Sequence, residues 1–403
     1  MRDELEAATA AIREALGGGA AFAPQPLLAD HVPDGTALVV RTSGSTGAPR
    51  EVALSVSALR ASAAATHERL GGPGRWFLAL PVGHVAGLQV ISRSVVAGTR
   101  AGGGARGPFT PDGFAAEAGK FLSDGDGHRT YVSLVPTQAH RLVEAADAGA
   151  PEGLDTLARF DAVLLGGAAT PLPLRGRLRD AGVRAVATYG MSETCGGCVY
   201  DGVPLPGVRV RLAEERPGVV EISGPMLATG YLGSADAAAA TRAAFRTGPD
   251  GTRWFRTSDL GSLDAGGHLT ILGRADDVIV TGGVNVAPAA VEAVLAELGE
   301  VCVVGVPDPE WGQAVVAVLA AGDGTATSRA HPRPPSDTGR PALAPATRDL
   351  TDRARDLVTS ALGRAAAPRR LYLTPALPLR GPGKPDRAAV EAAVSAELPR
   401  ATP

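Results

Sequence analysis

Short apolar segments, each ended by glycine or proline, recur in the first half of the chain and constrain its fold more than any other feature. They lie at residues 76–82, 129–136, 161–167 and 183–190, with helical stretches rich in alanine, leucine and arginine between them. Strands that alternate with helices pair in parallel, because a parallel pair needs a long crossover connection. We therefore expect an α/β fold with mostly parallel sheets.

The segments that precede this series fit the same class. Residues 1–20 have the pattern of an amphipathic helix. Residues 36–42 form a short apolar run that leads into a Gly/Ser/Thr loop, and residues 55–70 have helical character.

The second half of the chain has a different pattern of apolar and polar residues. Residues 207–224 and 268–274 are alternating or compact β segments joined by Gly and Pro turns, which predicts a β-rich subdomain. Residues 290–320 combine a helix with two apolar strands, and a second helix follows at 349–363. These last segments predict a compact α+β unit.

We accordingly divide the chain into a large domain at 1–272, a hinge at 273–277 and a small C-terminal domain at 278–403. Within the last, residues 322–347 contain five prolines and Leu343 as their only large aliphatic residue. Such a segment buries too little apolar surface to offset its ordering entropy, so we expect a disordered-type surface loop.

The overall composition excludes some functions. A net charge of −3 gives no reason to expect nucleic acid as a partner. The first residues lack the apolar stretch of a signal peptide, and no run is long enough to span a membrane. Three cysteines are too few for a disulfide framework, which fits the cytoplasm. We expect a cytoplasmic protein that acts on small molecules, without membrane insertion.

Cys195 and Cys198 form a CxxC pair, which is half of a zinc site or a redox pair. No second CxxC or HxxxH pattern completes a tetrahedral site. We favour the plainer interpretation that these residues line a loop.

The first segment that suggests chemistry follows the strand at 36–42. Its glycines let the backbone direct several N–H groups at one anion, and its hydroxyls add donors, which suits a polyphosphate. It is not a Walker A loop because the G-K-[ST] ending is missing, and taken alone it is an ordinary turn. The loop comprises Thr42, Ser43, Gly44, Ser45, Thr46 and Gly47, followed by Pro49 and Arg50.

Further segments place isolated charges on loops. Glu193, in the motif at 189–194, is a candidate Mg²⁺ ligand, because Mg²⁺ uses one or two carboxylates together with substrate oxygens. Asp259 follows a predicted strand and could accept hydrogen bonds from ribose hydroxyls. Lys384 stands alone on a Gly/Pro loop in a chain with few lysines.

The order and spacing of these motifs resemble those of the adenylate-forming superfamily, which includes acyl-CoA synthetases, adenylation domains of peptide synthetases and luciferases. The resemblance extends from about Thr36 to Arg387. It implies a large N-terminal domain, a small mobile C-terminal domain, and an AMP-forming ligase that uses ATP, Mg²⁺ and coenzyme A. A homodimer is expected only by analogy with the family.

The resemblance also implies individual roles. Glu193 would hold Mg²⁺. Asp259 would bind the ribose, with Arg274 assisting it, and Asp276 would be the hinge. Lys384 would bridge the substrate carboxylate and the α-phosphate. Gly282 and Gly283 would border the CoA thiol. The remaining nucleotide contacts would come from the phosphate loop with Arg50, from Gly166, Gly167 and Ala168, and from Tyr189, Gly190, Met191, Ser192 and Thr194.

The chemistry agrees with these roles. A carboxylate that attacks a phosphate brings two anions together, so positive charge must offset their repulsion. In the second step, the thiol of coenzyme A must approach the carbon of the activated carboxyl group, and Lys384 must no longer occupy that place. A rotating C-terminal domain would explain why this lysine follows a hinge.

The sequence also departs from the pattern of the superfamily. Arg50 replaces the usual lysine, Ser258 replaces a glycine, and residues 288–292 lack the first common glutamate. The phosphate loop begins at residue 42, so we expect most of the usual first subdomain to be absent. None of these departures removes a charged catalytic group.

The acyl substrate is indicated by His84 and by Arg93, nine residues later in an apolar helical stretch. A buried arginine there needs an anionic partner, although a snorkelling arginine at a helix edge is the ordinary alternative. Together with Thr137 and its neighbours, this spacing is similar to that of o-succinylbenzoate–CoA ligases of menaquinone biosynthesis. The resemblance implies that one substrate carboxylate is activated and the other pairs with Arg93.

Other functions stay open at this point. Another aryl or fatty acyl-CoA ligase is the main alternative. An adenylation domain for a carrier protein is disfavoured because no carrier serine motif follows, and a non-catalytic nucleotide-binding protein would be expected to have lost Glu193 or Lys384.

Overall fold

The structure is a computed structural model, and it describes residues 2–42, 50–103, 107–125, 127–213, 218–320, 341–380 and 384–397. The chain divides into two compact units. The first unit comprises Met1–Thr170, Leu174–Thr257 and Ser262–Thr270, and the second comprises Pro171–Pro173, Ser258–Gly261 and Ile271–Pro403.

A seven-stranded sheet in the order β4-β3-β5-β6-β7-β8-β9 forms the centre of the first unit. The strands from β4 to β7 are parallel, and β8 and β9 are antiparallel additions. The apolar segments of the first half form β3, β5, β6 and β7, which confirms the predicted α/β class. In sheet order the bounds are Gly102–Gly103, Gly74–Leu78, Arg129–Leu134, Ala162–Leu165, Ala185–Met191, Gly196–Tyr200 and Val203–Pro204.

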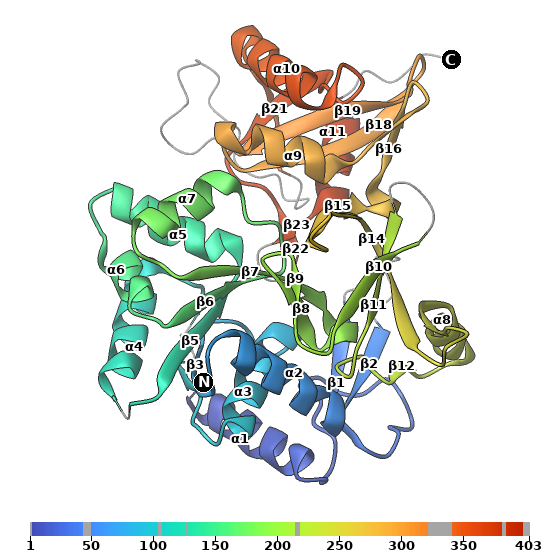
Figure 1. Ribbon diagram of the computed structural model, residues 1–403. Coiled ribbons are helices and arrows are strands. Elements are labelled where there is room, and N and C mark those ends of the chain that lie inside the picture. Colours follow the sequence, from blue (N-terminus) through green and yellow to red (C-terminus); the bar gives the residue numbers. More distant parts are fainter. Residues whose placement is uncertain are drawn as a thin grey trace. The chain divides into compact units, whose positions relative to one another are not determined.

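Helices cover both faces of this sheet (Figure 1). Because side chains alternate along a strand, the neighbours Trp76 and Phe77 point to opposite faces. Phe77 packs in a core formed with α4 (Pro111–Ser123), α5 (Pro136–Asp147), α6 (Glu152–Ala158) and α7 (Leu172–Asp180). The face with Trp76 is covered by α2 (Val56–Arg69) and α3 (Val85–Val96), and α1 (Arg2–Leu16) packs on α3.

Two further sheets complete the β structure of this half of the chain, as the predicted β-rich subdomain requires. The first pairs β1 (Thr36–Thr42), β2 (Arg50–Ser55) and β12 (Gly230–Leu232). In the other, strands run in the order β10-β11-β14-β13 and β15 pairs with β14. Its bounds are Arg209–Leu212, Gly218–Ser223, Arg253–Leu263, Phe245–Thr247 and, for β15, Leu269–Arg274; α8 is Ala235–Ala244.

The second unit is an α+β structure, as predicted. Its sheet has the order β17-β16-β19-β21-β20, and β18 pairs with β19. Neighbouring residues of β18 face different cores: Val303 packs with α9 and α10, whereas Val304 packs with α11. The strand bounds, from β16 to β23, are Ile279–Thr281, Val284–Val286, Val301–Asp308, Gly312–Ala320, Ala344–Pro345, Arg370–Thr374, Leu379–Arg380 and Lys384–Pro385. The helices are η2 (Ala275–Asp277), α9 (Pro288–Leu295), η3 (Ala296–Leu298), α10 (Arg348–Leu362) and α11 (Arg387–Glu397).

The end of the proline-rich segment differs from the prediction of a loop at 322–347. Ala344 and Pro345 form β20, antiparallel to β21, and Leu343 packs against the core that contains Val304. The preceding residues, up to 340, lie outside the described part of the chain. A short edge strand tolerates proline because it needs few backbone donors, which the composition of the segment did not reveal.

The structure also corrects the interpretation of the CxxC pair. Cys195 lies in the turn before β8 with φ 52°, as expected of a loop residue, whereas Cys198 lies in β8 itself, and both are buried. Burial raises the pKa of the Cys198 thiol to about 12 and raises that of Cys195 as well. Neutral buried thiols suit packing better than metal binding or redox exchange.

Within the described residues, no helix is both long and apolar enough to cross a membrane.

Candidate active site

Several of the residues predicted for the site follow the carboxyl ends of adjacent parallel strands. His84 immediately precedes α3 in the connection after β3, and Thr137 lies in the first turn of α5 after β5. Gly166–Ala168 follow β6, and residues 189–194 end β7 and form the 3₁₀ turn η1 (Ser192–Thr194). Because β3, β5, β6 and β7 are neighbours, these residues come to one edge of the sheet, where open α/β sheets bind ligands.

The ends of the predicted phosphate loop face each other across a hairpin. Thr42 ends β1 and pairs with Arg50 at the start of β2, and the Thr42 hydroxyl donates to the Arg50 carbonyl at 3.3 Å. Ser43, Gly44, Ser45, Thr46 and Gly47 lie outside the described residues. A loop at the tip of a hairpin has both ends fixed by the strands.

Glu193 lies in η1 and is held by a neighbour from another sheet. The Tyr231 hydroxyl, on β12, donates to Glu193 Oε1 at 2.8 Å, and the Arg50 guanidinium lies 5.4 Å from the centre of the Tyr231 ring. Burial and the Glu193 charge raise the pKa of Tyr231, so its hydroxyl stays protonated and can donate. This cluster brings Glu193 beside the end of the phosphate loop.

The turn around Glu193 is closed by its own residues. The Met191 N–H donates to the Thr194 hydroxyl at 2.9 Å, and that hydroxyl donates to the Gly196 carbonyl at 2.8 Å. Thr194 is fully buried, so its side chain shapes the turn. At Gly190 a Cβ would lie 2.0 Å from the Gly196 carbonyl, so only glycine lets β7 and β8 approach here.

The carboxylate of Glu193 is compatible with Mg²⁺. Among the described residues, no group of three or more His, Cys, Asp or Glu side chains could hold a metal ion. Magnesium needs no such cage, because it keeps waters and takes one or two carboxylates together with phosphate oxygens. Glu193 would hold the ion, whose charge offsets that of the phosphates.

In the second unit, Asp259, the predicted ribose ligand, lies beside Arg274. Asp259 is 13% exposed, and the Arg274 guanidinium lies 3.7 Å from its Oδ1. Arg274 also donates to both carboxylate oxygens of Asp276, at 2.8 and 2.7 Å, and these bonds raise the pKa of the guanidinium. The predicted hinge residue is thus directly bonded to the predicted helper of Asp259.

Of the remaining predicted residues of this unit, Gly282 and Gly283 lie on a turn, whereas Lys384, which we expected on a loop, lies in a short strand. Gly282 and Gly283 join β16 to β17 with φ values of 56° and 78°, as a two-residue type I′ hairpin requires. The backbone of Lys384 begins β23 and pairs with Arg380 in β22. The part of Lys384 beyond its backbone lies outside what the structure describes.

Arg93 is 3% exposed on α3 and lies on the face that packs toward β8. One of its guanidinium nitrogens donates to the Tyr200 hydroxyl at 3.4 Å, and the group lies 4.9 Å from the Trp76 ring centre. Its Nε has no hydrogen-bond partner, and no carboxylate among the described residues forms an ion pair with it. Gln89, one helical turn earlier, donates to the Cys195 carbonyl, while its own side-chain oxygen is also unpartnered. Within the part of the chain that the structure describes, Arg93 is therefore a buried cation without an anionic partner.

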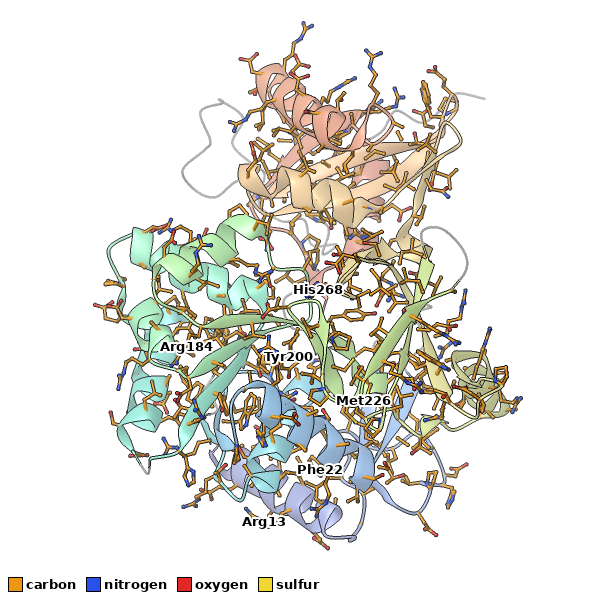
Figure 2. The ribbon with its side chains drawn as sticks, viewed as in Figure 1. Arg13, Phe22, Arg184, Tyr200, Met226 and His268 are labelled. Atoms are coloured by element: carbon orange, nitrogen blue, oxygen red, sulfur yellow. The ribbon has the colours of Figure 1, made fainter. Side chains whose placement is uncertain are left out.

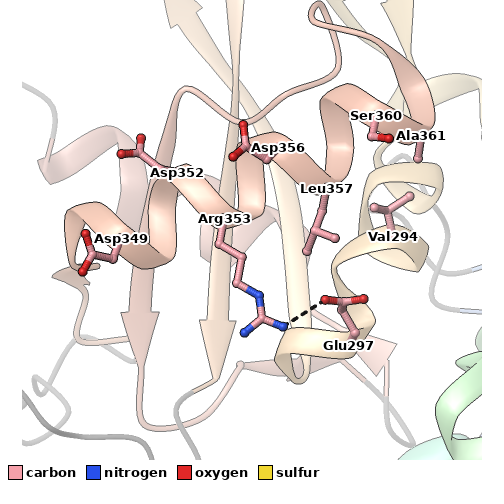
Figure 3. Close-up of a pocket in the computed structure, with 9 residues that line it drawn as sticks. All are labelled: Val294, Glu297, Asp349, Asp352, Arg353, Asp356, Leu357, Ser360 and Ala361. Carbon is pink, nitrogen blue, oxygen red and sulfur yellow. Dashed lines mark hydrogen bonds and ion pairs between the residues drawn. The ribbon is translucent and has the colours of Figure 1, made fainter.

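A large pocket of about 780 Å³ lies elsewhere, between α10 and the α9–η3 segment of the second unit (Figure 3). Its charged lining is mostly acidic, with Asp349, Asp352, Asp356 and Glu297 against Arg353, which pairs with Glu297 at 3.1 Å. Such a lining repels carboxylates and nucleotides. None of the residues predicted for the site lines it.

Sequence reasoning missed Tyr231, Trp76 and Tyr200, which contact Glu193 or Arg93. The available signal was their rarity, because the chain has only five tyrosines and three tryptophans. A buried tyrosine hydroxyl or indole N–H usually has a polar partner. Rarity alone does not identify that partner.

Comparison with known families agrees with this geometry. The family of AMP-binding enzymes matches residues 4–232, and the AMP-binding enzyme C-terminal domain matches residues 290–384. The chain belongs to the AMP-binding enzyme family. The predicted superfamily and its fold are thereby confirmed.

Individual relatives of this AMP-binding enzyme include two from Mycobacterium tuberculosis. A protein named "Probable 2-succinylbenzoate--CoA ligase" is 40% identical over 377 residues, which are 90% of this chain and 85% of the relative. A medium/long-chain-fatty-acid–CoA ligase is 31% identical over 93% of this chain and 64% of its own length.

A solved relative has been captured with the ligands of the reaction. The o-succinylbenzoate CoA synthetase of Bacillus subtilis, in complex with its acyl-adenylate intermediate, is 27% identical, with a TM-score of 0.66 over 88% of this chain and 68% of that one. The same protein with ATP and a magnesium ion is 26% identical, with a TM-score of 0.68 over 89% and 70%.

Proposed function

We propose that this AMP-binding enzyme is a 2-succinylbenzoate–CoA ligase of menaquinone biosynthesis that works in the cytoplasm. The observation that supports this substrate is Arg93, a buried guanidinium that pairs with no carboxylate among the described residues. A buried cation is costly unless it is paired, so a substrate that brings a second carboxylate gains from binding there.

The reaction has two steps, as the family chemistry requires. One carboxylate of the acid attacks the α-phosphorus of ATP and releases pyrophosphate, which leaves an acyl-adenylate. The thiol of coenzyme A then attacks the acyl carbon and releases AMP. The second carboxylate takes part in neither step and serves recognition.

Each predicted residue would assist a specific part of substrate binding or of the reaction. Arg50 and the phosphate loop would hold the polyphosphate, with Glu193 on Mg²⁺. The Lys384 ammonium would offset the approach of two anions in the first step. Asp259 would hold the ribose, with Arg274 keeping its carboxylate in place. Arg93 would bind the second carboxylate, with His84 and Thr137 bordering the acyl group.

Relatives with the same family chemistry act on other acids, so a substrate panel must test the proposal. We would measure pyrophosphate release with o-succinylbenzoate, benzoate, a long-chain fatty acid and the two analogues that each lack one carboxylate of o-succinylbenzoate. We expect o-succinylbenzoate to have the highest kcat/KM. A preference for benzoate or for the fatty acid would contradict the proposal.

The role of Arg93 needs its own variant. Arg93→Gln should raise the KM for o-succinylbenzoate about 10- to 100-fold and leave the KM for ATP unchanged, because only the second carboxylate loses its partner. Arg75→Gln is the matched control, since Arg75 is a buried arginine that packs on Phe121 instead. An unchanged KM for o-succinylbenzoate in Arg93→Gln would refute the role.

We also propose, by analogy with the family, that the enzyme forms a homodimer. Sedimentation of the full chain would test this directly.

A further inference from the structure

The Arg93 guanidinium is surrounded by side chains from neighbouring elements of the first unit. Trp76 on β3 stacks against its guanidinium with 4.9 Å between the group and the ring centre. Tyr200 on β8 accepts a hydrogen bond from Arg93 at 3.4 Å, and Figure 2 labels this residue inside the first unit. Thr66 and His67, consecutive on α2, stand behind these two aromatic residues.

The groups that contact Arg93 are themselves held by hydrogen bonds. The Tyr200 and Thr66 hydroxyls share a hydrogen bond at 3.1 Å. The Trp76 indole Nε1–H donates to His67 Nε2 at 3.3 Å, and the Trp76 ring packs 4.9 Å from that of Tyr131. All of these residues are less than a tenth exposed. Neither aromatic wall can therefore turn away from Arg93 without breaking a buried contact.

Every one of these groups is uncharged at neutral pH. Burial and the nearby Arg93 charge lower the pKa of His67 to about 4, and its Nε2 lone pair is used to accept from Trp76. The hydroxyls, the indole and the neutral thiols nearby add no negative charge. We call Trp76, Tyr200, Thr66 and His67 the neutral cage.

A cage without an anion has a functional consequence. Cation–π contact and one hydrogen bond offset part of the cost of burying the guanidinium, while its Nε stays unsatisfied. A protein carboxylate at this position would stabilise Arg93 more strongly, but it would also compete with a carboxylate of the substrate. The neutral cage fixes the position of the cation and leaves its charge unbalanced.

We infer that Trp76 and Tyr200 are positioning residues that hold Arg93 in this neutral cage, so that its charge is available to the second carboxylate of the acyl substrate. This inference rests on the proposed function. It adds specificity determinants that do not touch the substrate themselves.

The test uses the full-length enzyme with Tyr200→Phe and Trp76→Phe, which keep an aromatic ring at each position. Each variant should raise the KM for o-succinylbenzoate about threefold to tenfold, because Arg93 loses one fixing contact. The KM for ATP should not change. The kcat/KM for the single-carboxylate analogue that still reacts should not change either. Tyr131→Phe is the matched control, since it loses a buried hydroxyl bonded at 2.8 Å to the Gly72 carbonyl and contacts the same tryptophan.

Double variants separate this inference from the proposed function. If Tyr200 acts through Arg93, Tyr200→Phe should add nothing to the KM in an Arg93→Met background. Additive effects, or equal losses with the dicarboxylate and the single-carboxylate analogue, would overturn the positioning role. If Arg93→Met alone leaves the KM for o-succinylbenzoate unchanged, the proposed function of Arg93 fails instead. If Arg93→Met raises that KM but Tyr200→Phe and Trp76→Phe both behave like Tyr131→Phe, the positioning role of the neutral cage is refuted. The proposed function of Arg93 then stands.

Discussion

At the scale of single residues, the buried Arg93 guanidinium affects the charge of its neighbour His67. Arg93 and His67 lie close together in the same unit, and only Arg93 can be charged at neutral pH. Two adjacent buried cations would repel each other in a medium of low dielectric constant. A neutral His67 therefore avoids a second positive charge beside Arg93.

His67 provides a prediction about stability and pH. Its pKa is about 4 in the folded protein and 6.5 in a model peptide, so below pH 6.5 the unfolded chain binds a proton that the folded chain does not. The free energy of unfolding should therefore fall as the pH decreases from 6.5 to 4, by about 2–3 kcal/mol from this residue. Urea unfolding at several pH values, compared with His67→Gln, should show a smaller acid loss in the variant.

The glutamine is chosen because its side-chain oxygen can still accept from Trp76. His140→Gln serves as a control for an exposed histidine, which pairs with Glu144 at 3.0 Å on the surface of α5. Equal acid sensitivity of the wild type and His67→Gln would contradict the assignment of a neutral, buried His67.

At the scale of elements, the site depends on contacts between segments from different sheets. The turn η1 follows β7 of the central sheet, whereas Tyr231 lies on β12, which pairs with β2 and so with the phosphate-loop hairpin. The backbone adds a second link, because the Ala228 N–H donates to the Glu193 carbonyl at 2.8 Å. The position of Glu193 is thus set jointly by two sheets.

Tyr231→Phe should weaken the use of magnesium. The variant keeps the ring that packs on Phe245 and lies below Arg50, but it loses the hydroxyl that orients Glu193. Groups that orient a metal ligand typically contribute about 10- to 100-fold in metal affinity. We expect the Mg²⁺ concentration for half-maximal pyrophosphate release to rise about tenfold.

Tyr131→Phe again supplies the control, because its hydroxyl is bonded only to carbonyls at the end of α2. A Mg²⁺ titration of Tyr231→Phe that superimposes on that of the control would show that Tyr231 does not orient Glu193.

At the scale of the whole molecule, the residues predicted for catalysis and for substrate binding belong to two units. Glu193 and Arg93 are in the first, and Asp259, Arg274 and Lys384 are in the second. The chain passes between the units around Pro171–Pro173, within β14 and within β15, and the last of these crossings lies nearest the hinge predicted at Asp276. A division of this kind suits a reaction whose two steps need different groups at the same carbon.

Lys384→Ala should separate the two half-reactions. Adenylation should fall about 10²- to 10³-fold, because the attacking carboxylate and the α-phosphate lose a neutralising cation. Thioester formation from a supplied acyl-adenylate and coenzyme A should stay largely intact. Pyrophosphate release and CoA consumption, measured separately, test this expectation, and an equal loss in both would contradict the two-conformation account.

Much of the architecture followed from periodicity and spacing. The apolar runs predicted β3, β5, β6 and β7, because a buried parallel strand needs side chains that are apolar on both faces. The β segments β2 and β8 were not predicted. In β8, glycines and cysteines replace the usual strand formers, and the pairing with β7 decides the conformation.

The sequence by itself determined the class of reaction, since ordered motifs with isolated charges are local and can be recognised without the fold. Only the tertiary structure decided which neutral side chains surround Arg93 and which tyrosine holds Glu193. Two of those contacts join residues more than 30 positions apart, Arg93 with Tyr200 and Glu193 with Tyr231. Their strength depends on burial and on the absence of a competing charge, and these properties exist only after the sheets and helices have packed.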